Sequence, residues 1–193
     1  MSPYRLPGFE PVKLQYVSAY EAYNDNSVLK SKKGVNPTVS ITRDNFQAYA
    51  RANGNAHWNM YTYQAHKAIT WLFVVEYANR NCQAAYNASL TAEGYHQGGL
   101  GEGVTTGTIT VSGATVYNYV PTGTTDSLGN NSGIVEYTTT TADETQRTVN
   151  VPRYRGIENP FGHIWKNTCD VKVSGTDNSV YLVKDIITES YEL

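Results

Sequence analysis

The chain has little charge and little cysteine for its 193 residues. Only 17% of the residues are charged, the net charge is −2, and two residues are cysteines. Because 40% of the residues are hydrophobic, the composition differs from that of a highly charged disordered chain. The length suffices for one domain with its own core. The balance of charge excludes the basic surface expected of a protein that binds nucleic acid.

The sequence also lacks a long apolar run. Its longest apolar stretch, residues 71–75, is far shorter than the roughly 20 residues that a membrane-spanning helix needs. The N-terminal sequence MSPYRLPGFEPVK has no apolar segment of the kind that a signal peptide contains. We therefore expect no membrane insertion and synthesis in the cytoplasm without a signal peptide. If the protein acts outside a cell, a particle or a larger polypeptide carries it there.

Motifs for metal binding and catalysis are missing as well. Cys82 and Cys169 have no CxxC neighbour, so a disulfide between them and two free thiols both stay open. No HExxH or GxSxG motif is present. Widely spaced residues of catalytic type are His57, His66, His96 and His163, with Glu21, Glu76, Glu136 and Glu158, and nothing in their spacing demands that they converge.

From these absences we predict a protein that is not an enzyme and has no catalytic, cofactor-binding or metal-binding residues. The segment Gly98-Gly99-Leu100-Gly101 is not a phosphate loop, because no GK[ST] follows and the next residues are typical of a strand. Calcium binding stays open at residues 126–131, since oxygen ligands from a loop leave little signature in a sequence.

Tyrosine is the abundant aromatic residue, with 16 Tyr against 4 Phe and 3 Trp. A tyrosine ring has an apolar face and a polar tip, which suits recognition surfaces. It also suits the half-buried faces of antiparallel sheets. Both interpretations stay open.

The first half of the chain predicts two helices after an extended N-terminal segment, residues 1–30. Pro3, Pro7 and Pro11 break helices there, and residues 13–17 alternate as a strand does. One helix begins after the N-cap Thr42 and closes at Asn53-Gly54. The longest helix covers residues 62–82. Its three-four spacing predicts that Ile69, Leu72 and Phe73 are buried.

The second half is rich in Thr, Val, Ile and Tyr and predicts antiparallel strands. Helices that precede a run of strands define an α+β domain, which we place at residues 31–193. The expected strands are 108–111 and 114–120 around a turn at Ser112-Gly113, then 134–139, 146–151, 170–173 and 180–183.

Several stretches together are similar to a known family: YEAYNDN, ITRDNFQAYARANGNAHWNMYTYQAHKAITWLFVVEYANRNCQ and VPRYRGIENPFGHIWKN. They resemble the C-type-lectin-like domains of tail-fibre or receptor-binding proteins of phages and prophages of gut anaerobes, including members diversified by retroelements. Formylglycine-generating enzymes share that fold. The similarity covers roughly residues 14–183 and implies a C-type-lectin-like fold, with two helices packed on antiparallel strands and hairpins.

The resemblance implies a ligand- or receptor-binding domain that recognises a host surface glycan or protein without catalysis. The alternative is a structural virion component, a fibre or adaptor, that uses the fold to assemble with other virion proteins. A remote alternative is an oxidase of the formylglycine-generating type, which needs a late cysteine pair that this chain lacks. The expected location is a virion or the extracellular space after synthesis in a bacterial cytoplasm.

The block RGIENPFGHIW also has a direct physical interpretation. Gly156 and Gly162 allow a tight backbone path, and Phe161, Ile164 and Trp165 are expected in the core under the sheet. The polar residues Glu158 and Asn159 of the same block are expected to form hydrogen bonds with the backbone nearby, as turn residues do.

One departure from the family is the C-terminal end. The chain stops at Leu193, soon after the last hairpin, where such domains continue into their variable binding surface. We therefore expect a shortened copy or a fold completed by a neighbouring subunit. The family's binding residues therefore cannot be carried over to this chain, and the ligand-binding residues are unknown.

Both ends predict self-association into a homo-oligomer, with a trimer favoured because fibre-borne domains of the family sit on trimeric shafts. Apolar residues that need burial are Leu6, Phe9, Val12 and Leu14 at one end and Ile186, Ile187, Tyr191 and Leu193 at the other. The alternative is that both ends fold back on their own domain.

Overall fold

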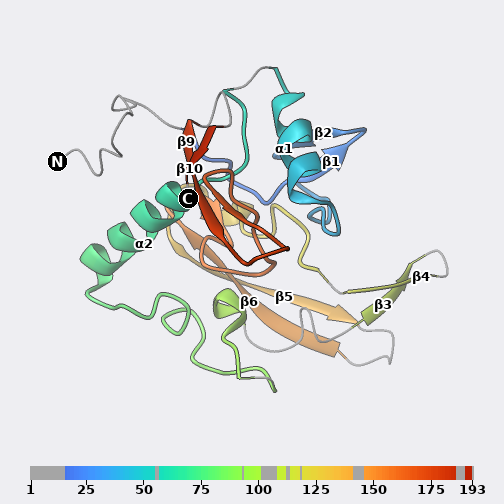
Figure 1. The fold of residues 1–193 in the computed structure, drawn as a ribbon. Coiled ribbons are helices and arrows are strands. Elements are labelled where there is room, and N and C mark those ends of the chain that lie inside the picture. The colour runs from blue at the N-terminus through green and yellow to red at the C-terminus, as the bar shows by residue number, and fades with distance from the viewer. Residues whose placement is uncertain are drawn as a thin grey trace.

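The predicted α+β class is confirmed by a computed structural model, which describes residues 16–54, 57–92, 94–100, 108–111, 114–117, 119–140, 146–185 and 190–192. The described residues form two α-helices and several small antiparallel sheets (Figure 1). The helices precede most of the strands in the chain, as the order of patterns predicted.

Helix α2 spans Tyr63–Tyr77 and is the longer of the two helices. Its N-cap is Thr62, whose hydroxyl accepts a hydrogen bond from the Ala65 backbone N–H at 3.0 Å. The carboxylate of Asp170 accepts two further bonds from N–H groups of the first turn, at 2.8 and 3.2 Å. Backbone donors that a helix cannot satisfy itself are thus satisfied by a residue more than one hundred positions away.

Helix α2 is shorter than predicted. It ends at Tyr77 instead of Cys82, because Ala78 adopts a left-handed conformation with φ of 48°. The Asn79 and Asn81 side chains then accept hydrogen bonds from nearby backbone N–H groups, at 2.9 and 3.0 Å. Such local hydrogen bonds compete with helix formation, and the spacing of apolar residues does not predict them.

The burial of α2 is confirmed at two of the three predicted positions. Phe73 is 1% exposed and Ile69 is 8% exposed, whereas Leu72 is 49% exposed, so its prediction was wrong. Helix α2 is apolar on several faces, with Val75 also 80% exposed. The sequence pattern therefore does not specify which apolar face meets the core.

The largest sheet consists of β5 (Gly133–Thr140), β6 (Gln146–Tyr154) and β7 (Ile157–Glu158), in that order and antiparallel. One core cluster lies against β6 and consists of Leu100, Val120, Val149 and Val151. A second cluster joins the end of β6 to α2 through Ile69, Phe73, Tyr154 and Phe161. The Phe73 ring meets Tyr154 and Phe161 edge-on, with centroids 5.5 and 5.1 Å apart.

Helix α1 (Arg43–Arg51) has Thr42 as its N-cap, as predicted, and packs against the hairpin of β1 (Tyr23–Asp25) and β2 (Val28–Lys30). The guanidinium of Arg43 donates to the backbone carbonyls of Thr168 and Cys169, at 3.3 and 3.0 Å. Asp170, in the same short segment, caps α2. Residues 168–170 therefore contact both helices through hydrogen bonds.

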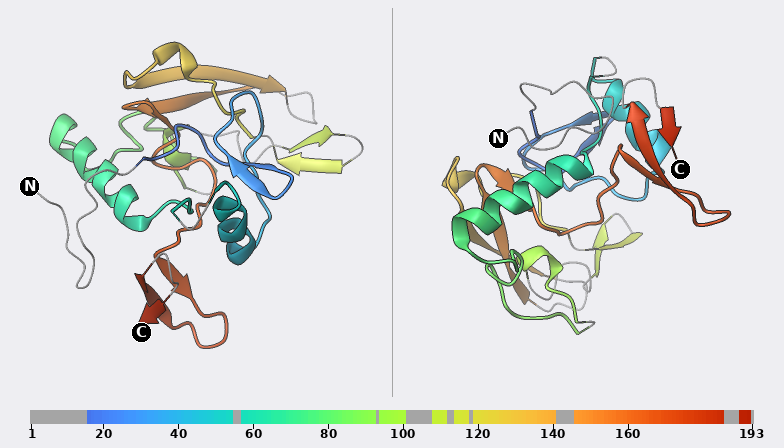
Figure 2. Two further views of the ribbon diagram at one scale, coloured as in Figure 1. Left: turned by 90° about the horizontal axis from the view of Figure 1, so that it is seen from above. Right: turned by 60° about the vertical axis from the view of Figure 1, so that its left-hand side comes forward.

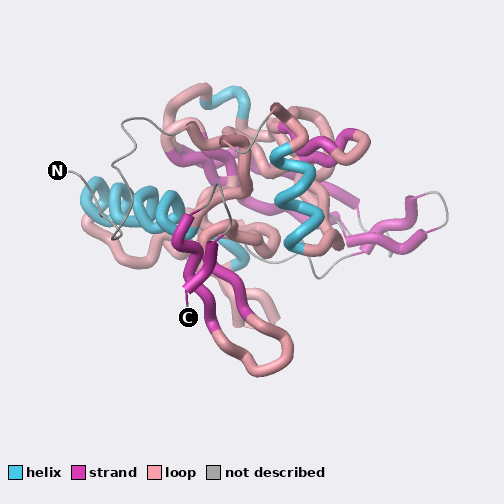
Figure 3. The backbone as a smooth tube through the Cα atoms, turned by 45° about the horizontal axis from the view of Figure 1, so that its top comes forward, coloured by secondary structure: helices cyan, strands magenta, loops and turns pink. Residues whose placement is uncertain are grey.

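Two hairpins project from the body (Figures 2 and 3). The first pairs β3 (Thr108–Val111) with β4 (Ala114–Tyr117), four residues each, which confirms the predicted strands except that β4 ends before residue 120. The second contains β8 (Val171–Val173), β9 (Val180–Asp185) and β10 (Ser190–Glu192), with β9 in the middle. The predicted hairpin of residues 170–183 is confirmed.

Several predicted features lie outside the described residues. They are residues 13–15 of the strand predicted at 13–17, the turn at Ser112-Gly113, the N-terminal apolar residues Leu6, Phe9, Val12 and Leu14, and the C-terminal residues Ile186, Ile187 and Leu193. Tyr16 and Val17 are described and lie in no strand, so that part of the strand prediction was wrong. Within the described part of the chain, neither helix is long and apolar enough to cross a membrane.

Candidate functional site

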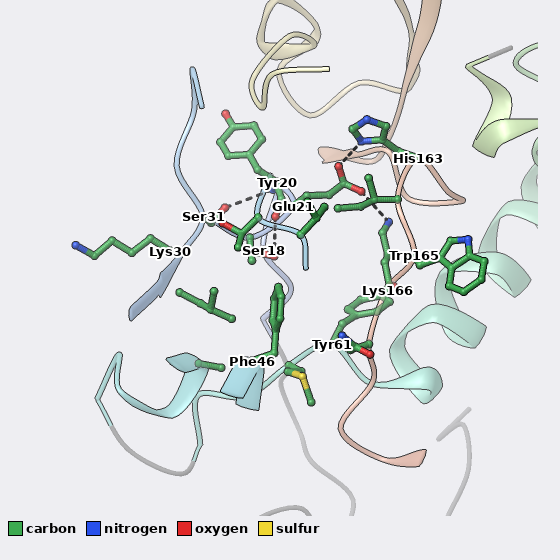
Figure 4. A pocket seen from close by; sticks show the side chains of 18 of the residues that line it. Ser18, Tyr20, Glu21, Lys30, Ser31, Phe46, Tyr61, His163, Trp165 and Lys166 are labelled. Carbon is green, nitrogen blue, oxygen red and sulfur yellow. Dashed lines mark hydrogen bonds and ion pairs between the residues drawn. The ribbon is translucent and has the colours of Figure 1, made fainter. Parts of the chain in front are cut away.

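A cavity of about 920 Å³ opens beside helix α1. Its wall comes from stretches far apart in the sequence: the segment around β1 and β2, the loop before α1, α1 itself, the segment before α2, and residues 157–167 (Figure 4). The size is typical of pockets that hold a small molecule or a chain end of a larger ligand.

One side of the cavity is apolar. Leu29 of β2 and Phe46 and Ala50 of α1 contribute to the lining, together with Met60 from the segment before α2 and Ile164 from the loop after β7. Leu29, Ala50 and Met60 are buried, so these side chains belong to the core and also form the cavity wall. Apolar side chains beside polar groups that orient a ligand are the usual composition of a ligand pocket.

Glu21 and His163 form a buried pair at this cavity. Glu21 Oε2 lies 2.5 Å from His163 Nδ1, and the two side chains are 7% and 0% exposed. The Val120 backbone N–H donates to His163 Nε2 at 3.3 Å. Since Nε2 accepts this bond, the ring proton is on Nδ1 and is donated to Glu21, so His163 is neutral in this arrangement.

Lys166 approaches the same carboxylate from the other side (Figure 4). Its Nζ lies 3.8 Å from Glu21 Oε1 and donates to the Asn159 carbonyl oxygen at 2.6 Å. The Lys166 side chain is 29% exposed, but desolvation of its ammonium lowers the pKa of the group, and the negative charge of Glu21 partly opposes that shift. Glu21 Oε1 is buried and accepts no hydrogen bond from the described residues.

A close contact between two glycines holds His163 in place. The backbones of Gly98 and Gly162 approach so tightly that a Cβ on Gly98 would lie 2.5 Å from the Gly162 carbonyl carbon. Both glycines have positive φ, 72° and 154°, where L-residues are strained. Next to this contact, Gln97 donates to the His163 carbonyl oxygen at 3.2 Å. The contact therefore positions the residues at the cavity from two loops.

Glu158 is a second buried carboxylate of the cavity lining, at 3% exposure. Its Oε1 accepts from the Gly123 N–H at 2.9 Å, and its Oε2 accepts from the Thr125 N–H and hydroxyl at 2.8 and 2.6 Å. Arg153 Nη1 donates to the Thr125 hydroxyl at 2.9 Å and so supplies a nearby positive charge. Both oxygens of Glu158 are satisfied, which gives this residue a structural role.

The prediction for Glu158 was therefore wrong, because its partners are 33 and 35 residues away and not in its own turn. Trp165 was also predicted wrongly. It is fully exposed, at 102%, and its ring points away from Glu21 and Lys166 (Figure 4). Phe161 is buried as predicted and Ile164 is half-buried at the cavity.

The loop of residues 126–131 is engaged within the protein. Asp126 accepts a hydrogen bond from the Tyr20 hydroxyl, which raises the pKa of that tyrosine, and lies 3.8 Å from both Lys33 and Arg153. Among the residues that the structure describes, no three His, Cys, Asp or Glu side chains gather in a way that would hold a metal ion.

The structure separates most of the other residues of catalytic type. Glu76 of α2 accepts hydrogen bonds from Tyr154 and Arg155, at 2.7 and 2.9 Å, and Glu136 is exposed on β5. His66 is half-buried in α2, where burial lowers its pKa, and His57 and His96 lie in other segments. Glu21 and His163 meet although 142 positions separate them, and no spacing signal indicates such a pair.

The two cysteines are both free thiols. Cys82 is half-buried, and Cys169 is fully buried with its Sγ 3.3 Å from the Met60 carbonyl oxygen. Burial raises the pKa of the Cys169 thiol to about 11. A thiol that stays protonated at neutral pH is a poor nucleophile.

Comparison with protein-family models, with curated proteins and with solved structures gave no match. What the cavity can bind therefore has to follow from its own geometry.

Proposed function

We propose that this protein is a non-enzymatic recognition domain with a C-type-lectin-like fold, of the phage or prophage tail-fibre type. It binds a glycan or a protein on the surface of a host cell, and the cavity beside α1 is its binding site. The single observation that supports this proposal most is the cavity itself, which combines a volume of about 920 Å³, an apolar wall and a buried carboxylate with an unsatisfied oxygen.

The geometry of His163 and Glu158 favours binding over catalysis, and we assign the oxygen of Glu21 that accepts no hydrogen bond from the described residues to binding. A general base needs a free lone pair that faces the substrate. His163 has no such lone pair, because Nε2 accepts from Val120 and Nδ1 faces Glu21. Glu158 is bound on both oxygens by donors of the protein. These groups hold the cavity in shape, which is what a recognition site requires.

The proposal is tested by the adhesion of the purified, fluorescently labelled protein to cells of a panel of gut anaerobes. The variant Asn167→Trp adds a large ring at an exposed residue of the cavity lining. The matched control is Thr176→Trp, at the exposed tip of the β8–β9 hairpin. We expect adhesion of the wild type and the control, and its loss in Asn167→Trp. Equal adhesion of the two variants would contradict the proposed site.

A second candidate function is that of a structural virion component, and the exposed face of α2 favours it. Trp71, Leu72 and Val75 of that face are 55%, 49% and 80% exposed. Exposed apolar groups of this size are typical of surfaces that another protein covers. A homo-oligomer, a trimer in the favoured case, would cover such a face. Light scattering decides between a single chain of 21.4 kDa and an oligomer, and Val75→Lys should dissociate an oligomer held by α2.

A further inference from the structure

The geometry points to a neutral saccharide unit as the ligand of the cavity, held by Glu21 and Lys166 through neighbouring hydroxyl groups without a metal ion. This inference rests on the proposed function and names the chemistry of its ligand. Three observations support it: the unsatisfied polar atoms, the balance of charge, and the apolar wall beside them.

The first observation is a matched acceptor and donor. Glu21 Oε1 accepts no hydrogen bond from the part of the chain that the structure describes, although the side chain is only 7% exposed. Lys166 Nζ lies 3.8 Å away, beyond the usual hydrogen-bonding distance. It donates to Asn159, and an ammonium has further donors. One ligand hydroxyl can donate to Glu21 while its neighbour accepts from Lys166, which is the pattern of two adjacent hydroxyls on a sugar ring.

A buried acceptor without a partner carries a free-energy cost that a ligand removes. Asn59, also in the cavity lining, has a buried Nδ2 that finds no acceptor in the described part of the protein. The cavity therefore offers both unsatisfied acceptors and unsatisfied donors. A hydroxyl serves either, because it donates through its hydrogen and accepts through its oxygen.

The second observation is the balance of charge. The Glu21 carboxylate and the Lys166 ammonium offset each other, and His163 is neutral because its Nε2 accepts from a backbone N–H. Lys30, another residue of the lining, is paired with Asp25 at 2.6 Å. An anionic ligand would face Glu21 and a cationic one would face Lys166. A neutral ligand avoids both repulsions.

The third observation is the apolar wall on the other side of the cavity. Phe46 lies across from Glu21 in Figure 4, with Leu29 and Ala50 also in the lining. A sugar ring has an apolar face of C–H groups and an edge of hydroxyls. Such a ring fits a cavity that is apolar on one side and polar on the other.

The test is calorimetric titration of the full chain with glucose, galactose, mannose and N-acetylglucosamine, and with charged glucosamine and N-acetylneuraminic acid. We expect at least one neutral sugar to bind with a dissociation constant of about 1 mM or tighter, and to bind equally in the presence of EDTA. Glu21→Gln and Lys166→Met should each weaken binding by about tenfold to a hundredfold. The matched control Glu136→Gln, on exposed β5, should bind as the wild type does.

Several outcomes would overturn the inference: no binding of a neutral sugar, preference for a charged one, loss of binding with EDTA, or binding that Glu21→Gln and Lys166→Met leave unchanged. If Glu21→Gln fails to fold, Asn167→Trp replaces it, because that residue lines the cavity and is exposed. Cell adhesion separates this inference from the proposed function. If no neutral sugar binds but Asn167→Trp still abolishes adhesion, the cavity is the recognition site and its ligand is of another class.

Discussion

Glu158 and Glu21 are two buried carboxylates in the lining of one cavity, and they differ in their hydrogen-bond partners. The Glu158 residue is 3% exposed and the Glu21 side chain is 7% exposed. Glu158 is surrounded by donors on both oxygens, with Arg153 close by. Glu21 has His163 on one oxygen and a lysine at 3.8 Å from the other. Burial alone therefore does not assign a role to a carboxylate. A satisfied carboxylate fixes the fold, and a partly satisfied one is available to a ligand.

The largest effect is expected at Glu158. Glu158→Ala removes the acceptor of the Gly123 and Thr125 N–H groups and of the Thr125 hydroxyl, and it leaves the buried Arg153 with Asp126, at 3.8 Å, as its neighbouring carboxylate. We expect a loss of about 3–5 kcal/mol in the free energy of unfolding, measured by urea denaturation. A loss as small as that of Glu136→Ala on the exposed face of β5 would show that the network does not stabilise the fold.

Asp170 is a third buried carboxylate, and each of its oxygens accepts one hydrogen bond from a backbone N–H. Its partners are the first N–H groups of α2, and Thr62 caps the same end. Asp170→Ala should therefore cost about 1–2 kcal/mol, less than Glu158→Ala. The same urea experiment measures it. A cost above that of Glu158→Ala would break the relation between satisfied oxygens and stability.

Glu21→Gln should have a smaller effect on stability, about 1 kcal/mol or less, because the amide oxygen still accepts from His163. The affinity for a neutral sugar should fall in the same variant. A change in stability equal to that of Glu158→Ala would mean that both carboxylates serve the fold and that the distinction between them is wrong.

The smallest effect concerns pH. Burial holds the pKa of Lys166 below its ordinary value of 10.5, so its ammonium is lost at a lower pH than that of an exposed lysine. Saccharide binding should decline as the pH rises through that lowered pKa. The free energy of unfolding should rise over the same interval, up to pH 10.5, because the unfolded chain binds more protons there than the folded chain does. Titration calorimetry across this interval, with Lys166→Met as the control that shows no decline, measures the effect on binding.

Local features of the fold were predictable from the sequence. Thr42 and Thr62 start helices because a hydroxyl at the N-cap satisfies a backbone donor of the next turn. The strands of the β5–β6 pair follow from alternation and β-branched residues. These signals lie within a few residues of the structure that they specify.

The cavity was not predictable in this way. Glu21 meets His163 across 142 positions, and Asp170 caps α2 across 107, so no local pattern contains either contact. Leu72 is a second case in which a local pattern is not sufficient. Its spacing in α2 is that of a core residue, and only the packing of Tyr154 and Phe161 on Phe73 decides which face is buried.

The different roles of Glu21 and Glu158 are tested by ¹³C NMR of their carboxylate carbons while a neutral saccharide is added to saturation. We expect the Glu21 Cδ resonance to move, because a hydroxyl then donates to its unsatisfied oxygen, and the Glu158 Cδ resonance to stay in place. A shift at Glu158 without one at Glu21, or saturation by the sugar with neither resonance moving, would contradict this expectation.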